Sequence, residues 1–372
     1  MRVDSFLSSL NKNGIMFFTG VPDSQLKALC DYLNSEKPES NITAANEGNA
    51  AAIAAGYYMA TKNVPCVYLQ NSGLGNIINP YASLLHEAVY AIPTLFVIGW
   101  RGEPNVHDEP QHVFQGKVTT SLLETLEIPY VILTKETTED ELSATLQDFS
   151  KVFSEGKSCA VVVKKGALTN DNEVTYKNEN TLRREDIIRK ITEYSKEDII
   201  VSTTGKTSRE LFEIREANKQ SHKYDFLTVG SMGHSSSIAL GIALNKPNSR
   251  IWCIDGDGAA LMHMGSLAVI GSQKPQNLIH IVINNAAHES VGGMPTAADK
   301  INLTKIAEAC GYEKTYSLKT IDELEDCLTH LENKLTFIEI KSAIGSRADL
   351  GRPTTTPVQN KEALMKYLEG LS

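Results

Sequence analysis

The sequence lacks the features that would place the protein in a membrane or in a secretory route. No apolar run reaches the roughly 20 residues that span a bilayer, and the N-terminal segment MRVDSFLSSLNKNG lacks the apolar core of a signal peptide. An excess of positive charge is also missing, since 45 acidic and 36 basic residues give a net charge of −9. This charge argues against nucleic acid or an anionic membrane as a partner. We therefore expect a soluble cytoplasmic protein.

Close pairs of cysteines are absent as well. The six cysteines are scattered, and Cys66 and Cys253 lie within apolar runs. This distribution favours buried thiols in a reducing compartment over a disulfide framework or a zinc site. With 372 residues, 41% of them hydrophobic, the chain can form two domains that each have a core.

What the sequence does contain is an alternation of short apolar runs and helical segments. Runs that predict buried strands include residues 67–69, 94–98, 159–163 and 336–340. This order predicts an α/β fold of three-layer α/β/α domains with mostly parallel sheets. The polar, aperiodic segment 169–182 predicts a linker between a domain of residues 1–168 and a domain of residues 183–372. The charged segment 99–116 predicts a long functional loop.

The stretch 251–290 carries the strongest chemical signal. One apolar run ends at Asp255-Gly256-Asp257-Gly258 and the next ends at Asn284-Asn285. Asp257 and Asn285 are 28 positions apart, which allows a crossover helix, expected over residues 259–271, and a return strand. Ligands bind at the carboxyl ends of such strands, and carboxylate and amide oxygens suit Mg²⁺. A plain Asp-Gly turn is the alternative, and a dinucleotide fingerprint is excluded because Leu261 replaces its third glycine.

The second half of the chain matches the first at a constant offset of 185 positions. The matches run without a gap and comprise Gly20 with Gly205, Gly48 with Gly233, Gly56 with Gly241, Gln70-Asn71-Ser72-Gly73 with Asp255-Gly256-Asp257-Gly258, and Val97-Ile98-Gly99 with Val282-Ile283-Asn284. A duplication explains this register better than chance. The copies differ at two chemically important places, because Ser72 stands at the position of Asp257 and Met232 at the position of Glu47.

GDG followed by NN after a stretch of this length resembles the diphosphate-binding motif of thiamine-diphosphate (ThDP) enzymes. The resemblance implies a pyrimidine-binding domain and a diphosphate-binding domain of the same fold, with no middle domain. It also implies that Glu47, in NEGNAAAIAAGYYMA, hydrogen-bonds the aminopyrimidine ring of ThDP and triggers deprotonation of thiazolium C2. Stabilisation of a helix N-terminus by the charge of Glu47 is the alternative role.

The same resemblance assigns the remaining cofactor contacts. Mg²⁺ would be held by Asp257, Asn285 and the main-chain carbonyl of Ala287. The family usually has glycine near position 286 or 287, where this chain has two alanines. Residues expected near the cofactor are Gly205, Lys206, Thr207, Ser231, Met232, Gly256, Gly258 and Ala259. Met232 would support the bent form of ThDP, although an ordinary core methionine is the alternative.

The segments GVPDS, HDEPQH, NNAAHESVGG and GSRADLGRPTTTP resemble phosphonopyruvate decarboxylases, and sulfopyruvate decarboxylases are similar. The resemblance implies decarboxylation of 3-phosphonopyruvate to phosphonoacetaldehyde in phosphonate biosynthesis, in a self-associated protein whose active sites lie between subunits. The small anionic 2-oxo acid substrate would meet Arg347 and Arg352, unless these belong to a solvated tail. Asp23, His112 and His288 are expected to handle protons. Sulfopyruvate decarboxylation and a non-catalytic ThDP-binding module remain the alternative functions.

Overall fold

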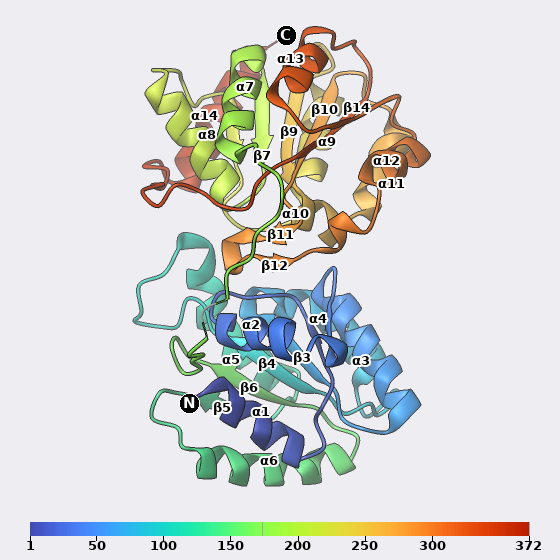
Figure 1. The fold of residues 1–372 in the computed structure, drawn as a ribbon, viewed down its shortest axis with the longest axis vertical. Helices are drawn as coiled ribbons and strands as arrows, with labels where there is room; N and C mark the ends of the chain where they lie inside the picture. Colours follow the sequence, from blue (N-terminus) through green and yellow to red (C-terminus); the bar gives the residue numbers. More distant parts are fainter. Residues whose placement is uncertain (173, 372) are drawn as a thin grey trace. The chain divides into compact units, whose positions relative to one another are not determined.

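The computed structural model describes residues 1–172 and 174–371, and the chain divides into two compact units, Met1–Thr175 and Tyr176–Ser372 (Figure 1). The division falls within the segment 169–182 that the sequence predicts to be a linker. Among the described residues, no helix is both long enough and apolar enough to cross a bilayer. All six cysteines are free thiols and five of them are buried, which agrees with the prediction from their scattered positions.

The N-terminal unit has a six-stranded sheet in the order β2-β1-β3-β4-β6-β5, with every neighbouring pair parallel. Its strands are β1 (Phe18–Gly20), β2 (Asn41–Thr43), β3 (Cys66–Gln70), β4 (Leu95–Gly99), β5 (Tyr130–Leu133) and β6 (Cys159–Val163). Its helices are α1 (Val3–Lys12), α2 (Lys27–Glu36), η1 (Pro38–Ser40), α3 (Glu47–Thr61), η2 (Asn71–Gly73), α4 (Leu74–Pro80), η3 (Tyr81–Leu85), α5 (Pro110–Thr125) and α6 (Glu139–Ser154).

Apolar strands form the centre of this unit because a parallel sheet is covered on both faces. Strands β4 and β6 are buried throughout. The alanine-rich side of α3 packs with α4, η3 and one face of the sheet, and small alanine side chains let the α3 backbone come close to the strands. Helices α1 and α6 lie side by side (Figure 1).

The C-terminal unit has a second six-stranded parallel sheet, in the order β13-β14-β10-β9-β7-β8. Its strands are β7 (Ile199–Ser202), β8 (Asp225–Leu227), β9 (Ile251–Gly256), β10 (Leu278–Asn284), β13 (Lys314–Leu318) and β14 (Thr336–Lys341), and a separate antiparallel pair is formed by β11 (Ala287–His288) and β12 (Met294–Pro295). Its helices are α7 (Arg184–Ser195), α8 (Lys206–Ala217), α9 (Ser235–Asn245), α10 (Asp257–Met262), α11 (Gly265–Gln273), η4 (Glu289–Val291), η5 (Ala297–Asp299), α12 (Leu303–Cys310), α13 (Ile321–Thr329) and α14 (Pro357–Glu369).

Alternating residues of β10 show the three layers of this unit. Ile279, Ile281 and Ile283 pack into a core with α7, α8 and α13. Leu278 and Val282 point to the other face and pack with α9, α11 and α12. Since successive side chains of a strand point to opposite faces, the sheet lies between two helical layers, as predicted.

The two sheets have the same topology, which confirms the predicted duplication. When β1 to β6 are matched with β7, β8, β9, β10, β13 and β14, the strand orders are identical. The offset of 185 positions also holds in the structure, because it joins the first residues of β3 and β9, Cys66 and Ile251, and the last residues of β4 and β10, Gly99 and Asn284.

Two local predictions are wrong. The expected loop 99–116 is shorter, because α5 begins at Pro110, whose fixed φ suits the first position of a helix. His112 and Gly116 are therefore helical. The helix expected over residues 259–271 is two helices, α10 and α11, separated where His263 leaves the helical conformation at φ −131° and ψ 46°.

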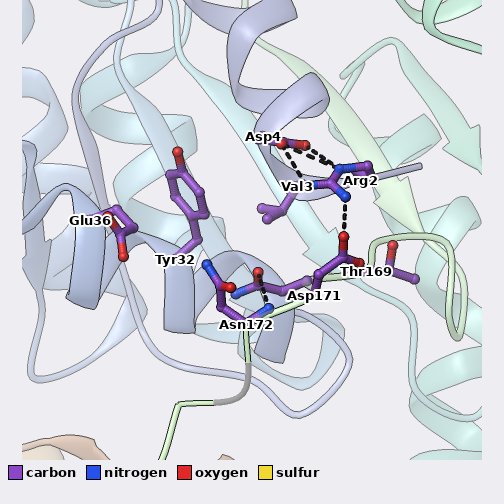
Figure 2. A pocket seen from close by; sticks show the side chains of 9 residues that line it. Arg2, Val3, Asp4, Tyr32, Glu36, Thr169, Asp171 and Asn172 are labelled. Carbon is purple, nitrogen blue, oxygen red and sulfur yellow. Dashed lines mark hydrogen bonds and ion pairs between the residues drawn. The ribbon is translucent and has the colours of Figure 1, made fainter.

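The chain entering the predicted linker is fixed to the N-terminal unit. Val3 N donates to Thr169 O over 2.8 Å, and Thr169 N donates to Met1 O over 3.0 Å. Arg2 forms ion pairs with Asp4 and Asp171, which Figure 2 shows. A cavity of about 230 Å³ lies beside these contacts and is lined by residues 2–4 and 169–172 together with Tyr32 and Glu36 of α2. No residue predicted to be catalytic or to bind the cofactor lines this cavity, so we interpret it as part of the anchoring of the chain.

Candidate active site

In the N-terminal unit, Glu47 is the first residue of α3 and is only 5% exposed. The helix begins there because the Asn46 side chain accepts a hydrogen bond from Asn49 N over 2.9 Å. Asn76 Nδ2 donates to Glu47 Oε2 over 2.7 Å. A Cβ atom on Gly73 would lie 2.4 Å from Glu47 Oε1, so the carboxylate rests against bare backbone. Glu47 is thus a buried carboxylate with one oxygen fixed by an amide.

Asp23 lies beyond the end of β1 and is fully buried. Gln70 Nε2 and Gln25 N donate to its two carboxylate oxygens. A Cβ on Gly99 would lie 2.0 Å from Asp23 Oδ2, so only glycine fits at the end of β4. Burial raises the pKa of Asp23, against the hydrogen bond from Gln70 and the charge of Arg101. A raised pKa lets a carboxyl group carry a proton closer to neutral pH.

His112 and Arg101 occupy the same end of this sheet. His112 is buried on α5, and its Nδ1 has no hydrogen-bond partner among the described residues. Burial lowers the pKa of His112, and the nearby positive charge of Arg101 lowers it further. Arg101 forms an ion pair with Asp108 and donates to Ser24 Oγ over 2.8 Å. The structure therefore places both His112 and Asp23 near the positive charge of Arg101.

In the C-terminal unit, Asp257 begins α10 directly after β9 and is 2% exposed. Thr296 Oγ1 donates to Asp257 Oδ2. Burial raises the pKa of Asp257 to about 6, and hydrogen bonds from Thr296 and from nearby backbone amides offset only part of this effect. A carboxylate that is this poorly compensated matches the requirements of a divalent cation, which would restore the charge balance on binding.

Asn285 follows β10 and is 6% exposed. Its Nδ2 donates to Glu289 Oε2 over 2.8 Å, while its Oδ1 accepts from Ala287 N over 3.0 Å. Ala286, between them, has a φ of 56°, in the left-handed region that favours glycine. The alanines that replace the family's usual glycine thus include one residue in a strained conformation.

A second group of predicted residues gathers at the start of α10. A Cβ on Gly258 would lie 3.1 Å from His288 Nδ1 and 3.4 Å from Met232 Cε, so both side chains flank the bare Gly258 backbone. Burial lowers the pKa of His288 to about 4, which keeps the imidazole neutral at pH 7. Ser231, directly before Met232, adopts a left-handed backbone conformation with a φ of 53°. Gly256 has open space where a Cβ would be, next to Asp257.

Gly205, Lys206 and Thr207 lie at the start of α8, where Gly205 adopts a φ of 93°. Lys206 Nζ pairs with Glu289 Oε1 at 3.0 Å. Burial alone would raise the pKa of Glu289, but Arg184 and Lys206 hold it below its usual range. Lys206 and Asn285 are therefore joined through one carboxylate.

The structure does not bring the predicted substrate residue Arg347 into these groups. Its guanidinium forms ion pairs with Glu185, Glu213 and Asp349, and this negative surrounding opposes binding of an anion. The side chain of Arg352 is exposed. A substrate role for either arginine stays a prediction.

Cys253, Asp255 and His280 form a further cluster in the sheet, with their possible ligand atoms within 4.8 Å of one another. His280 Nε2 lies 3.5 Å from Asp255 Oδ2, and Asp255 Oδ1 accepts from Gly256 N over 2.9 Å. Burial raises the pKa of the Cys253 thiol well above its usual range. Because a neutral thiol is a poor metal ligand, we interpret the cluster as structural support for the start of the GDG turn.

Several residues that contact the predicted site residues, within one unit or the other, were not predicted from sequence. They are Gln70, Asn76, Arg101, Asn178, Glu289 and Thr296. Asn178, in the predicted linker, donates through Nδ2 to Asn285 O over 2.9 Å. For Gln70 alone the repeat offered a signal, because Gln70 stands at the position of Asp255, the first residue of the Asp255–Gly258 motif. The others act through contacts between segments far apart in the chain.

Comparison with known proteins identifies the class. The N-terminal TPP binding domain of thiamine pyrophosphate enzymes matches residues 3–123, and the C-terminal TPP binding domain matches residues 203–340. The chain therefore belongs to the thiamine pyrophosphate enzymes, thiamine pyrophosphate being another name for ThDP. The predictions of an enzyme and of two homologous domains without a middle domain are confirmed.

Within this family the chain is similar to phosphonopyruvate decarboxylases, as its sequence segments predicted. Those of Streptomyces viridochromogenes and Streptomyces hygroscopicus are each 32% identical to it, over 95% and 96% of this chain and 91% of their own lengths. A sulfopyruvate decarboxylase of Methanosarcina acetivorans is 27% identical over 99% of this chain and 97% of its own length.

Replacing Ala286 by glycine should stabilise the protein. A left-handed φ costs an L-residue about 1 kcal/mol, and glycine avoids that cost at the price of a more flexible unfolded chain. We expect Ala286→Gly to raise the free energy of unfolding by up to about 1 kcal/mol in a denaturant titration. Ala287→Gly is the control: since Ala287 lies outside the left-handed region, it should lower stability, and equal losses for both variants would contradict the assignment.

Asp257→Asn should stabilise the protein in the absence of divalent metal ions. The pKa of Asp257 is raised from 3.8 to about 6, so its ionisation costs the folded state on the order of 3 kcal/mol at neutral pH. This cost is absent below about pH 4 and develops as pH rises through 6. Unfolding in EDTA should therefore show the variant to be more stable at pH 7.5, with the gap narrowing below about pH 6 and closing near pH 4. Equal stability at pH 7.5 would contradict the burial argument.

Proposed function

We propose that the protein decarboxylates 3-phosphonopyruvate to phosphonoacetaldehyde and CO2, using ThDP and Mg²⁺, as a step in phosphonate biosynthesis. The observation that carries this proposal is the presence of both chemical halves in one chain: buried Glu47 in the N-terminal unit and the buried pair Asp257 and Asn285 in the C-terminal unit. The names of the 32% identical relatives support the choice of substrate. A non-catalytic module would have little reason to retain both halves.

The residues of the C-terminal unit fit the cofactor's diphosphate and its metal ion. Asp257, Asn285 Oδ1 and the carbonyl of Ala287 would hold Mg²⁺, since hard cations prefer oxygen ligands. Gly256, with open space at its Cβ position, lets backbone approach a phosphate. When bound, ThDP supplies the carbon nucleophile and accepts the electrons released as CO2 departs.

The chain's own residues would then control protons and water. Glu47, fixed by Asn76, would exchange a proton with the aminopyrimidine ring. His288, neutral at pH 7, can accept a hydrogen bond next to Gly258. Burial raises the pKa of Asp23, so this carboxyl group is suited to protonate the intermediate that remains after CO2 has left. His112, near Arg101, is the other candidate for this protonation.

Assays of CO2 release on 3-phosphonopyruvate and sulfopyruvate test this function. We expect turnover of the phosphonate to exceed that of the sulfonate, because a phosphonate can carry an additional negative charge. Glu47→Gln should retain ThDP affinity, measured by calorimetry, and lose at least about 100-fold in kcat, the usual scale of proton-transfer catalysis. Faster turnover of sulfopyruvate would favour the alternative substrate, and absence of CO2 release from either would favour a binding module.

We further propose that Glu47 and Asp257 act in the same site only across two subunits, as the self-association implied by the family suggests. Mixing inactive Glu47→Gln chains with inactive Asp257→Asn chains tests this. In a two-fold dimer each mixed pair would contain one intact site, so random exchange should restore about a quarter of wild-type activity. No recovery in verified mixed dimers would show that each site is formed within one chain.

A further inference from the structure

The carboxylate of Glu289 occupies a central place in a buried network of the C-terminal unit. Arg184 Nη1 donates to Glu289 Oε2 over 2.9 Å, and Lys206 Nζ donates to Glu289 Oε1 over 3.0 Å. Arg184 also binds Glu210 in a bidentate pair, at 2.7 and 2.8 Å. Two cations and two carboxylates balance in charge, and the side chains of Glu289, Arg184 and Glu210 are 8%, 7% and 2% exposed. This pairing holds the carboxylate of Glu289 in one place.

The remaining partner of Glu289 is Asn285, one of the proposed metal ligands. Asn285 Nδ2 donates to Glu289 Oε2 over 2.8 Å. An asparagine amide can point either its oxygen or its NH2 group towards a neighbour, and only the oxygen can bind Mg²⁺. If the amide were reversed, its oxygen would face the carboxylate of Glu289 and its NH2 group would face Ala287 N–H. Both contacts would be repulsive.

We propose that Glu289 is a positioning residue that selects the metal-binding orientation of the Asn285 amide, an inference that rests on the metal site of the proposed function. Arg184 and Lys206 fix the Glu289 carboxylate, the carboxylate takes the NH2 group of Asn285, and the amide oxygen is thereby kept for the cation. Partners of this kind outside the ligand set commonly change metal affinity by about 10- to 100-fold.

Glu289→Gln tests this role because it preserves size while adding an NH2 group that can donate a hydrogen bond to the oxygen of a reversed Asn285 amide. We expect it to weaken Mg²⁺ binding about tenfold or more, measured by calorimetry at saturating ThDP. Glu210→Gln is the matched control, since it removes a carboxylate from the same Arg184 without touching Asn285. It should lower the melting temperature and leave Mg²⁺ affinity within about threefold of the wild type.

A second substitution separates orientation from general damage. In Asn285→Asp the orientation of the side chain no longer matters, because either carboxylate oxygen can bind Mg²⁺. When Glu289 is present, however, the new carboxylate faces the like charge of Glu289. It should therefore weaken Mg²⁺ binding in the wild type and strengthen it in the Glu289→Gln background, bringing the double variant to within about threefold of wild-type affinity.

The outcomes distinguish this inference from the proposed function. Unchanged Mg²⁺ affinity in Glu289→Gln would overturn the positioning role alone. Equal losses in Glu289→Gln and Glu210→Gln, with no rescue by Asn285→Asp, would also overturn it, because a purely structural network predicts that result. If wild-type protein bound ThDP equally well with Mg²⁺ and with EDTA, the metal site itself would be wrong, and this inference with it.

Discussion

The C-terminal unit depends on the burial of one carboxylate that the chain itself does not neutralise. Asp257 is almost fully buried, and burial raises its pKa to about 6 because the hydrogen bonds from Thr296 and from backbone amides offset only part of the cost of burying the charge. The surrounding features serve this group: β9 ends at Gly256, Thr296 approaches from the segment after β12, and the glycines leave backbone accessible. An uncompensated buried charge of this kind lowers the stability of the folded unit, a cost that is common at functional sites.

Duplication of one fold explains how the two chemical halves arose with different side chains. Both sheets present their strand ends at one edge, but the edge of the N-terminal unit has Ser72 where the C-terminal unit has Asp257. The N-terminal unit instead buries Glu47 against Gly73 and fixes it with Asn76. The two copies therefore bury different carboxylates, Glu47 in one and Asp257 in the other, on a backbone scaffold with the same strand order.

The sequence predicted the fold, the repeat and the positions of the strand-end residues, because these follow from local patterns. Apolar runs identify parallel strands, and parallel strands bring Asp257 and Asn285 to one edge. It did not predict the side-chain partners. Glu289 meets Lys206 from 83 positions away and Arg184 from 105 positions away, contacts that only the packing of η4 against α7 and α8 defines. For the same reason the ion pairs of Arg347 with Glu185 and Glu213 were missed.

Local rules also failed where two signals competed. The charged residues after β4 suggested a long loop, but Pro110 begins a helix that carries His112 into a buried position. Small residues after Asp257 suggested one helix, but the chain leaves the helical conformation at His263. The start of α5 lies two residues before His112, and the break at His263 lies four residues after Ala259. Both are close to predicted site residues, where tertiary contacts decide the backbone conformation.

The anchoring of the chain between the units has a consequence for how the protein could be encoded. Hydrogen bonds and ion pairs attach it to the N-terminal unit as far as Asp171, whereas Asn178 and Asn180 attach it to the C-terminal unit at Ser342 O. Asn178 also reaches Asn285 O. If the chain were made as two separate polypeptides divided between these anchors, each polypeptide would keep the contacts that attach its end of the connecting segment to its own domain.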